Sequence, residues 1–490
     1  MRTNVHIEHI AGVDYPEWDE EFCYGPSQEY PEFASGSKKE IGTKENHVYG
    51  MVRDTLAALG MDKEYFGTED WNPFSEFAAP GDTVLVKPNM VYHENRNANQ
   101  GMDCLVTHPS IVRAVLDYVI LALKGNGKII LADAPVQGCD FEVLVKELHY
   151  DKIVEYYQKK HIQISLVDLR QLGEAGIAKI SSHFTADEDV VVDIGASSAF
   201  SYSKNLRITN YLPEYMEEYH NENAHKYSVA KVVMDADVII NLPKPKTHRK
   251  AGMTASLKNM VGCVAKKECL PHHTKGSKQE AGDEYLEYSV FKKWRTTLRE
   301  KNDRRAAAGK KESKLYDITD RLLRRAAAIR RTDAYAEGSW YGNDTLWRTV
   351  CDINRVVMYA DRKGILTDTP QRKMFILADM IIAGEGEGPL SPSPKQVGML
   401  VGGWEQIAVD KVISALMGFM PEDFPVIKNA AFGTRFQLPE NEFTISANDL
   451  TFRDKCLEEI RKEVVPFVPT SGWAERLEKK DEKDVDHQGY

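Results

Sequence analysis

The sequence lacks any hydrophobic run long enough to cross a membrane. Its longest apolar segments, such as VLDYVILAL at 115–123, fall well short of the roughly 18–20 residues that a spanning helix needs. The first twenty residues carry several acidic side chains and no apolar core, so they do not resemble a secretory signal. We therefore expect a cytoplasmic protein without a membrane span.

Cysteine is sparse, and its spacing excludes two classes of protein. The seven cysteines are scattered along 490 residues, and no CxxC pair occurs. A disulfide framework needs paired cysteines, and a ferredoxin-type cluster needs closely spaced ones. We expect reduced thiols and no iron–sulfur cluster.

An excess of positive charge is also missing. The net charge is −11 at neutral pH, which argues against a general nucleic-acid-binding protein, although a local basic patch can still bind phosphates. The phosphate-binding GxxxxGK[ST] loop is absent as well, so a nucleotide site of that type is not expected.

What the sequence does contain is an alternation of apolar strands and amphipathic helices that begins near residue 81. Predicted strands lie at 81–89, 127–135, 164–169, 190–195 and 236–243, and a helix at 108–125 follows the first of them. Such alternation predicts an α/β fold in which a mostly parallel sheet is covered by helices on both faces.

The chain is too long for one simple core, so we divide it by composition. The predicted parts are an N-terminal extension (1–78), an α/β domain (79–286), a basic helical insertion (287–345), a C-terminal α/β portion (346–468) and a polar tail (469–490). Within the insertion, the basic helices at 291–331 have two interpretations: a solvated face, or a binding surface for an anionic partner.

Polar side chains recur where the predicted strands end. Lys87 and Asn89 follow the first strand, Asp133 follows the next, and Lys244, Lys246 and His248 follow the last. Ligands of parallel sheets gather at the carboxyl ends of the strands. The pattern predicts either a shared cleft or ordinary loop solvation, and we favour the cleft.

The segment KPKTHRKAGMTASLKNMVG, residues 244–262, is the strongest candidate site. Its small residues allow close approach of a ligand to the backbone, whose N–H groups can then bind an anion. We expect an anion to be held by Lys87, Lys244, Lys246, Lys258 and these amides, with Asn89, Thr247 and Asn259 close to it. The alternative is that the lysines are surface charges flanking a tight turn.

Two further stretches carry candidate ligands or acid–base groups. His272 and His273, with Asp283 and Glu284, have the residue types of a divalent-metal site, although adjacent histidines point to opposite sides of an extended segment. Alternatively, these four residues contact a substrate, or they form hydrogen bonds that stabilise the loop. Glu385 in GEGEG follows another predicted strand and suits a general base.

Taken together, these stretches resemble domain-of-unknown-function family 362. The segments VLVKPNMV, KIILADAP, INLPKPKTH, LPHHTKGS and IIAGEGEGP occur in the order seen in that family, over roughly residues 80–420. Some members carry ferredoxin-type cysteine clusters or export signals, and we expect neither here. The resemblance implies the family's fold without specifying a reaction.

A second, local resemblance involves the segment from His248 to Lys258. It is similar to a stretch of nickel-pincer lactate racemases, in which the lysine holds the cofactor covalently and histidines transfer protons. Ala255 and Ser256 stand where those enzymes have paired glycines. The similarity implies a lysine-bound cofactor at Lys258.

Our leading expectation is an enzyme acting on a small carboxylated or phosphorylated substrate. Lys258 belongs to its catalytic set, His248 is the predicted acid–base group, and Asp133 and Glu385 are orienting or basic carboxylates. An isomerase or an oxidoreductase is the most plausible class. The alternatives are a redox or metal-handling accessory protein without turnover and a lactate-racemase-like isomerase. The cofactor is left open, with a divalent metal as one option.

Overall fold

A computed structural model describes residues 3–33, 40–171, 184–186, 188–209, 211–307, 314–329, 335–433 and 435–486. Within these residues, no helix is both long and apolar enough to span a membrane.

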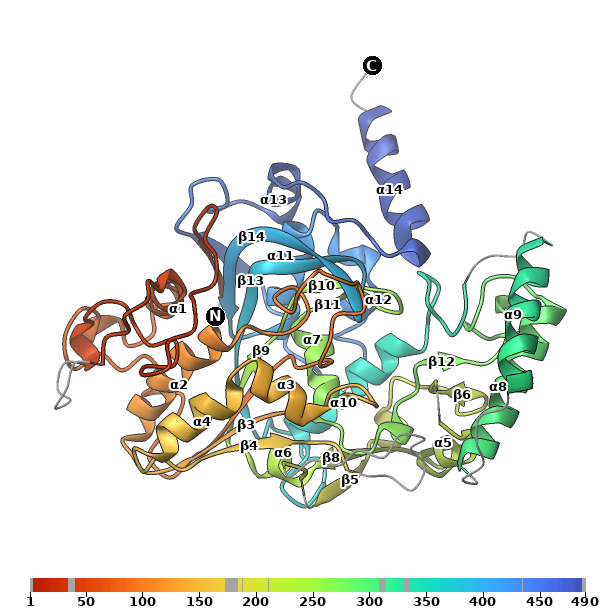
Figure 1. The fold of residues 1–490 in the computed structure, drawn as a ribbon, viewed down its shortest axis with the longest axis horizontal. Helices are drawn as coiled ribbons and strands as arrows, with labels where there is room; N and C mark the ends of the chain where they lie inside the picture. The colour runs from red at the N-terminus through yellow and green to blue at the C-terminus, as the bar shows by residue number, and fades with distance from the viewer. Residues whose placement is uncertain are drawn as a thin grey trace.

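A ten-stranded sheet forms the centre of the molecule (Figure 1). Its main path, from one edge to the other, runs through β15 (Phe443–Ala447), β1 (Thr3–His9), β14 (Ser391–Gly403), β13 (Lys373–Glu387), β9 (Val238–Leu242), β2 (Thr83–Pro88), β3 (Lys128–Asp133) and β4 (Ile164–Asp168). Neighbours from β13 to β4 are parallel, whereas β14 runs antiparallel to both β13 and β1. The expected mostly parallel α/β sheet is confirmed.

Helices cover both faces of this sheet, as the alternation predicts. One face packs against α1 (His47–Ala58), α2 (Pro109–Leu123), α3 (Phe141–Glu147) and α4 (Tyr150–Gln158). The other face packs against α7 (Ser256–Asn259), α10 (Leu346–Tyr359) and α11 (Gln406–Leu416). Each face has its own buried apolar cluster, so the central strands are buried on both sides.

Smaller elements surround this core. The short strands form two further sheets: β5 (Asp189–Asp193) with β8 (Ala224–Ala230) and β7 (His220–Asn221), and β6 (Leu206–Arg207) with β12 (His273–Thr274). The prediction that 190–195 continues the main sheet is wrong, because β5 pairs antiparallel with β8 instead. The remaining helices are α5 (Pro213–Tyr219), α6 (Lys231–Asp235), α8 (Val290–Ala307), α9 (Lys314–Ile329), α12 (Pro425–Lys428), α13 (Leu457–Glu463) and α14 (Ser471–Asp486).

Both ends of the chain contribute to the main body. The predicted N-terminal extension supplies β1, which lies between β14 and β15 in the main sheet. The predicted polar tail supplies α14, and its Trp473 is 1% exposed. The predicted basic insertion forms the helices α8 and α9, which lie side by side at one end of the molecule (Figure 1).

A short hairpin positions the segment that the sequence singles out. After β9, the chain forms β10 (Lys246–His248) and β11 (Gly252–Thr254), which pair antiparallel. Lys246 aligns with Gly384 of β13, so the hairpin joins the main sheet. Side chains alternate along a strand, so Lys246 and His248 face one side and Thr247 the other. The helical turn α7 then follows directly.

Candidate functional site

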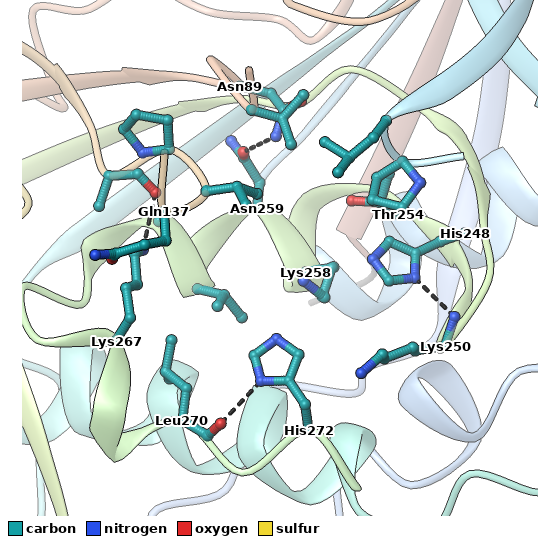
Figure 2. A pocket seen from close by; sticks show the side chains of 18 of the residues that line it. Asn89, Gln137, His248, Lys250, Thr254, Lys258, Asn259, Lys267, Leu270 and His272 are labelled. Carbon is teal, nitrogen blue, oxygen red and sulfur yellow. Dashed lines mark hydrogen bonds between the residues drawn. The ribbon is translucent and has the colours of Figure 1, made fainter. Parts of the chain in front are cut away.

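A cavity of about 280 Å³ lies beside the β10–β11 hairpin and α7 (Figure 2). Its walls come from the segments after β2 and β3, from the hairpin and α7, and from the loops around Ile208, Leu270 and Pro389. Of the expected site residues, Asn89, Asp133, Lys246, His248, Lys258, Asn259 and His272 line it. The prediction that several strand exits share one cleft is thus supported for β2, β3 and β9.

The cavity wall is strongly cationic. Six basic side chains line it: Arg96, Lys246, Arg249, Lys250, Lys258 and Lys267. Among the described lining residues, only Asp133 bears a carboxylate. An excess of cations in a concave, partly desolvated site attracts anions. The arrangement can therefore bind a small molecule that carries one or two negative charges.

The ring of His248 is held in one tautomer by backbone amides. Its Nδ1 accepts hydrogen bonds from the N–H groups of Lys250 (3.1 Å) and Ala251 (3.2 Å). Nδ1 therefore carries no proton, and Nε2–H of the neutral ring is a donor. Burial, and then the charge of Lys258, holds the pKa of His248 well below its usual value. The ring is neutral at physiological pH and presents a hydrogen-bond donor.

The ring of His272 is held in the opposite tautomer. Its Nδ1 lies 2.8 Å from the carbonyl oxygen of Leu270, which can only accept a hydrogen bond. The proton therefore sits on Nδ1, and Nε2 carries the free lone pair. Burial and the nearby Lys250 and Lys258 ammonium groups lower the pKa of His272. Figure 2 shows the two rings at the same cavity as Lys258.

Burial makes the lysines of the cavity weaker bases than ordinary lysines. It lowers the pKa of Lys246 to about 7, with further lowering by the neighbouring Lys244 charge. The pKa values of Lys250, Lys258 and Lys267 are lowered to about 8, again chiefly by burial. An anion inside the cavity would favour the charged form of each of these lysines.

A buried polar network supports the cavity from behind. Lys87 Nζ lies 2.7 Å from Asp133 Oδ1 and 3.3 Å from Asn259 Oδ1. Asn259 Oδ1 also accepts a hydrogen bond from Asn89 Nδ2 (3.0 Å), and Asn89 Oδ1 accepts one from Lys246 Nζ (2.7 Å). Lys87 does not line the cavity, so it is not placed to bind an anion as expected. It instead positions Asp133 and Asn259, which do line the cavity.

Asp133 is committed to the same network. Its Oδ1 also accepts the N–H of Ala134 (2.9 Å), and its Oδ2 accepts the N–H of Met90 (2.7 Å). Both oxygens are occupied and the side chain is 2% exposed. These contacts suit an orienting carboxylate, one of its two expected roles, better than a base.

Two other expected anion ligands point away from the cavity. Lys244 Nζ is buried against Asp379 Oδ2 (3.0 Å) and Tyr15 Oη (2.6 Å). Thr247, on the opposite side of β10 from its neighbours, donates a hydrogen bond to the carbonyl oxygen of Gly386 (2.7 Å). Both side chains stabilise the strand ends, and neither is placed to touch a ligand in the cavity.

Of the backbone amides of 244–262 that are expected to bind an anion, those of Ser256 and Leu257 at the start of α7 are already occupied. The carboxylate of Asp410, from α11, already accepts the N–H groups of Ser256 (2.8 Å) and Leu257 (3.1 Å) and the Ser256 hydroxyl (2.5 Å). Burial raises the pKa of this carboxyl to about 6. Asp410 therefore caps the turn that carries Lys258 and fixes its position.

The four expected metal ligands do not converge. Asp283 accepts hydrogen bonds from the N–H groups of Asp344 and Thr345, both at 2.8 Å. Glu284 accepts the N–H of Gly276 (3.1 Å), while His272 faces the cavity. Across the described part of the chain, no group of three His, Cys, Asp or Glu side chains is arranged to hold a metal ion.

Glu385 and the basic helices lie outside the cavity. Glu385 Oε2 accepts hydrogen bonds from Lys395 Nζ (3.2 Å) and the N–H of Val468 (3.0 Å), so it joins β13 to β14 and to the C-terminal segment. In the basic helices, several cations pair with carboxylates of the same chain, namely Lys293 with Glu280, Arg295 with Asp320, Arg299 with Glu337 and Arg304 with Glu214. These pairs leave less free charge for an anionic partner.

Four lining cations were not named as site residues from sequence. Lys250 lies within the segment 244–262, and at 6% exposure it turns inward from the hairpin. Lys267 lies in the loop after α7, where its Nζ donates to the carbonyl oxygen of Ala134 (2.9 Å). Arg96 and Arg249 are exposed residues of loops. Because side chains alternate along a strand, Lys250 is expected on the same side as His248, two residues before it. Arg96, Arg249 and Lys267 lie in irregular segments, where no such pattern indicates the direction of a side chain.

Comparison with known proteins supports one assignment. A family model described as "Domain of unknown function (DUF362)" matches residues 84–415. The thylakoid-associated protein sll1697 of Synechocystis sp. is 26% identical over 188 residues, which cover 38% of this chain and 41% of that protein. These matches add nothing to the local resemblance to lactate racemases. The family model spans more than half of the chain, and the chain therefore belongs to the family described as domain of unknown function DUF362.

Proposed function

We propose that this protein is an enzyme that binds a small carboxylated or phosphorylated substrate in the cationic cavity and transforms it by acid–base chemistry. The observation that carries the proposal is the composition of the wall: six basic side chains face the cavity with a single, fully engaged carboxylate. A purely structural cluster of this kind would be self-repulsive, and a bound anion relieves that repulsion.

The two histidines supply the chemistry of this proposal. Nε2 of His272 is a lone-pair acceptor and takes a proton from the substrate. Nε2–H of His248 donates a hydrogen bond to an oxygen on which negative charge develops. Lys258 and Lys267 bind the anionic group, and Lys246, whose Nζ is already hydrogen-bonded within the protein, attracts it through its charge. Both rings are already neutral at pH 7, so neither has to gain or lose a proton before the substrate binds.

Binding is tested by calorimetry with malonate and with inorganic phosphate. We expect affinity that weakens with added salt and falls at least tenfold in Lys246→Ala, whereas Lys204→Ala leaves it unchanged. Lys204 is a matched control because its side chain is 80% exposed in a surface pair with Glu222. Equal affinity in all three proteins would contradict the cavity as the site.

Turnover is tested by proton exchange. A panel of small hydroxy acids, oxo acids and phosphate esters is incubated with the protein in D2O, and loss of C–H signals is followed by NMR. We expect exchange with at least one member of the panel, abolished by His272→Gln and reduced by His248→Gln. Anion binding without exchange for any member would favour an accessory protein that binds without turnover.

The cellular location stays a prediction. We propose the cytoplasm, on the sequence grounds given above. The relative named as thylakoid-associated is one reason to test this by fractionation, which would recover the protein with membranes if the proposal is wrong.

A further inference from the structure

We propose that Lys258 bonds covalently to its substrate, its amine forming an imine with the carbonyl carbon of a 2-oxo acid held in the cavity. This inference rests on the proposed anion site and specifies its substrate class. It assigns to Lys258 a role that the bonding of Lys246 and the surroundings of Lys250 do not favour.

Lys258 differs from Lys246 in the bonding of its amine. In the described part of the chain, no group accepts a hydrogen bond from its Nζ, and no carboxylate pairs with it. By contrast, Lys246 Nζ is surrounded by Asn89 Oδ1, the Leu105 carbonyl and the Lys244 carbonyl, at 2.7, 2.8 and 3.2 Å. An amine that is fully hydrogen-bonded cannot present a lone pair, whereas Lys258 is free to do so.

Among the described residues, the Nζ of Lys250 also has no hydrogen-bond acceptor, but its surroundings differ. The charge with the strongest influence on Lys250 is the carboxylate of Glu337, which favours the ammonium form. The charge with the strongest influence on Lys258 is the ammonium of Lys87, which favours the neutral amine. A desolvated lysine beside another cation is the usual setting of a nucleophilic amine. Burial and Lys87 together bring the pKa of Lys258 to about 8, so a useful fraction is neutral near pH 7.5.

Two histidines lie at the same cavity as Lys258. Figure 2 shows the Lys258 side chain beside the rings of His248 and His272, and its charge lowers the pKa of both. Nε2–H of His248 is the donor for a carbonyl oxygen, and Nε2 of His272 is the acceptor for a proton. A carbonyl group next to Lys258 therefore meets a nucleophile, a hydrogen-bond donor and a proton acceptor.

The step balances without any other reactant. The nitrogen lone pair of Lys258 attacks the carbonyl carbon, and the C–N bond forms. His272 carries the two amine hydrogens in turn to the carbonyl oxygen, the C–O bond breaks, and the oxygen leaves as water. Nothing is oxidised or reduced. The carboxylate of a 2-oxo acid is held meanwhile by the remaining cations of the wall, which explains why a carbonyl substrate here would be anionic.

The experiment is reductive trapping of the full-length protein. Glyoxylate, pyruvate or 2-oxoglutarate is added with sodium cyanoborohydride at pH 7.5, and the modified residue is located by peptide mass spectrometry. We expect one adduct per chain on Lys258, at least tenfold above the labelling of the exposed Lys204 in the same sample. Excess malonate should suppress the adduct on Lys258 and leave that on Lys204 unchanged.

Mapping in the unaltered protein keeps the test independent of folding defects in variants. The variant Lys258→Met, checked for an unchanged melting temperature, should lose the adduct. If malonate binds by calorimetry but Lys258 is labelled no more than Lys204, the imine is overturned and the anion site stands. If malonate does not bind either, the proposed function fails together with the imine. Specific labelling of Lys250 instead would also overturn the assignment.

Discussion

Lys87 and Asp133 form a buried ion pair, with Nζ and Oδ1 2.7 Å apart, in which Asp133 lines the cavity and Lys87 lies behind it. Lys87 is the next-to-last residue of β2 and Asp133 is the last of β3, so the pair ties two adjacent parallel strands together at their carboxyl ends. Both side chains are fully or almost fully buried. Lys87→Met leaves the Asp133 charge buried without its partner, which should cost about 3–5 kcal/mol of unfolding free energy.

Urea denaturation followed by circular dichroism measures this loss. Lys44→Met is the matched control, because Lys44 pairs with Glu17 at the surface and the midpoint should not change. Similar midpoints for the two variants would show that the buried pair has no special role.

Gly262→Ala should disturb the same pair without removing either charge. A Cβ at position 262 would lie 2.0 Å from Asp133 Oδ1 and 2.7 Å from Lys87 Nζ, so the ion pair must move. We expect a lower melting temperature and weaker malonate binding in the same variant. Gly50→Ala is the control, since a Cβ there meets only the Tyr30 hydroxyl, at 3.3 Å, and alanine favours the helix. Unchanged malonate affinity in Gly262→Ala would show that the Lys87–Asp133 ion pair does not position the anion-binding site.

Anion affinity should fall as the pH rises from 7 to 9. The pKa values of Lys246 (about 7) and of Lys258 and Lys267 (about 8) lie below the 10.5 of an ordinary lysine, so these lysines lose their charge in this range. Each lysine whose charge is needed can weaken binding by up to about tenfold per pH unit above its pKa. Calorimetry with malonate in two buffers of different ionisation enthalpy should also detect proton uptake at pH 8. Affinity independent of pH would contradict the role of these lysines.

The same lysine shifts give the unliganded protein a contribution to stability that increases as the pH rises through this range. Between about pH 8 and 10.5, the unfolded chain binds more protons than the folded chain, because its lysines have the higher pKa. Malonate should make this increase in stability with pH smaller, because it favours the charged lysines of the folded state. Urea midpoints at pH 7.5 and 9, with and without malonate, measure both effects.

Asp410→Asn should destabilise the turn that carries Lys258. The carboxylate accepts hydrogen bonds from two backbone N–H groups and one hydroxyl. The NH2 group of an asparagine can only donate, so at least one of these three donors would lose its acceptor. We expect a loss of about 1–3 kcal/mol at pH 7. Asp140→Asn is the control, because Asp140 is an exposed N-cap of α3 and asparagine caps equally well.

The pH dependence of this variant has a defined sign. The pKa of Asp410 is raised from 3.8 to about 6, so the folded state binds more protons between these values, and this contribution to stability falls as the pH rises through that range. Asp410→Asn removes the contribution, and its destabilisation should therefore be larger at pH 4 than at pH 7. An equal loss at both pH values would contradict a raised pKa.

The position of the site could be predicted from sequence much better than the direction of each side chain. Polar residues at strand ends correctly indicated Asn89, Asp133, Lys246 and His248 as neighbours, because parallel strands end at one edge of a sheet. The role of Lys244 depends on Tyr15 and Asp379, which are 229 and 135 residues away, and no local pattern reveals such partners.

The direction of the His272 side chain could not be predicted from sequence either. Its pairing with His273 suggested a metal ligand, and adjacent side chains on an extended segment diverge as expected. Which of the two faces the cavity depends on packing of the loop at Leu270 and on the hydrogen bond from Asn343 to the His272 carbonyl. The tautomer of each histidine likewise depends on backbone groups that only the folded chain brings close.

Trp473 connects the C-terminal segment to the site, which a solvated polar tail would not do. Its Nε1 donates a hydrogen bond to the carbonyl oxygen of Arg249 (3.0 Å), and its ring packs against Phe424 over the turn at Gly252. Trp473→Ala should cost about 3–5 kcal/mol, because a buried aromatic ring is lost. It should also weaken malonate binding, because the turn that carries Arg249 and Lys250 loses its support.

Trp294→Ala is the matched control for this last prediction. Trp294 lies on α8 with its side chain 61% exposed, so its removal should change neither the melting temperature nor malonate affinity. Thermal denaturation and calorimetry on both variants measure the two effects. Loss of stability in Trp473→Ala with full malonate affinity would mean that α14 stabilises the fold without positioning the cavity wall, and the C-terminal helix would then have no part in the site.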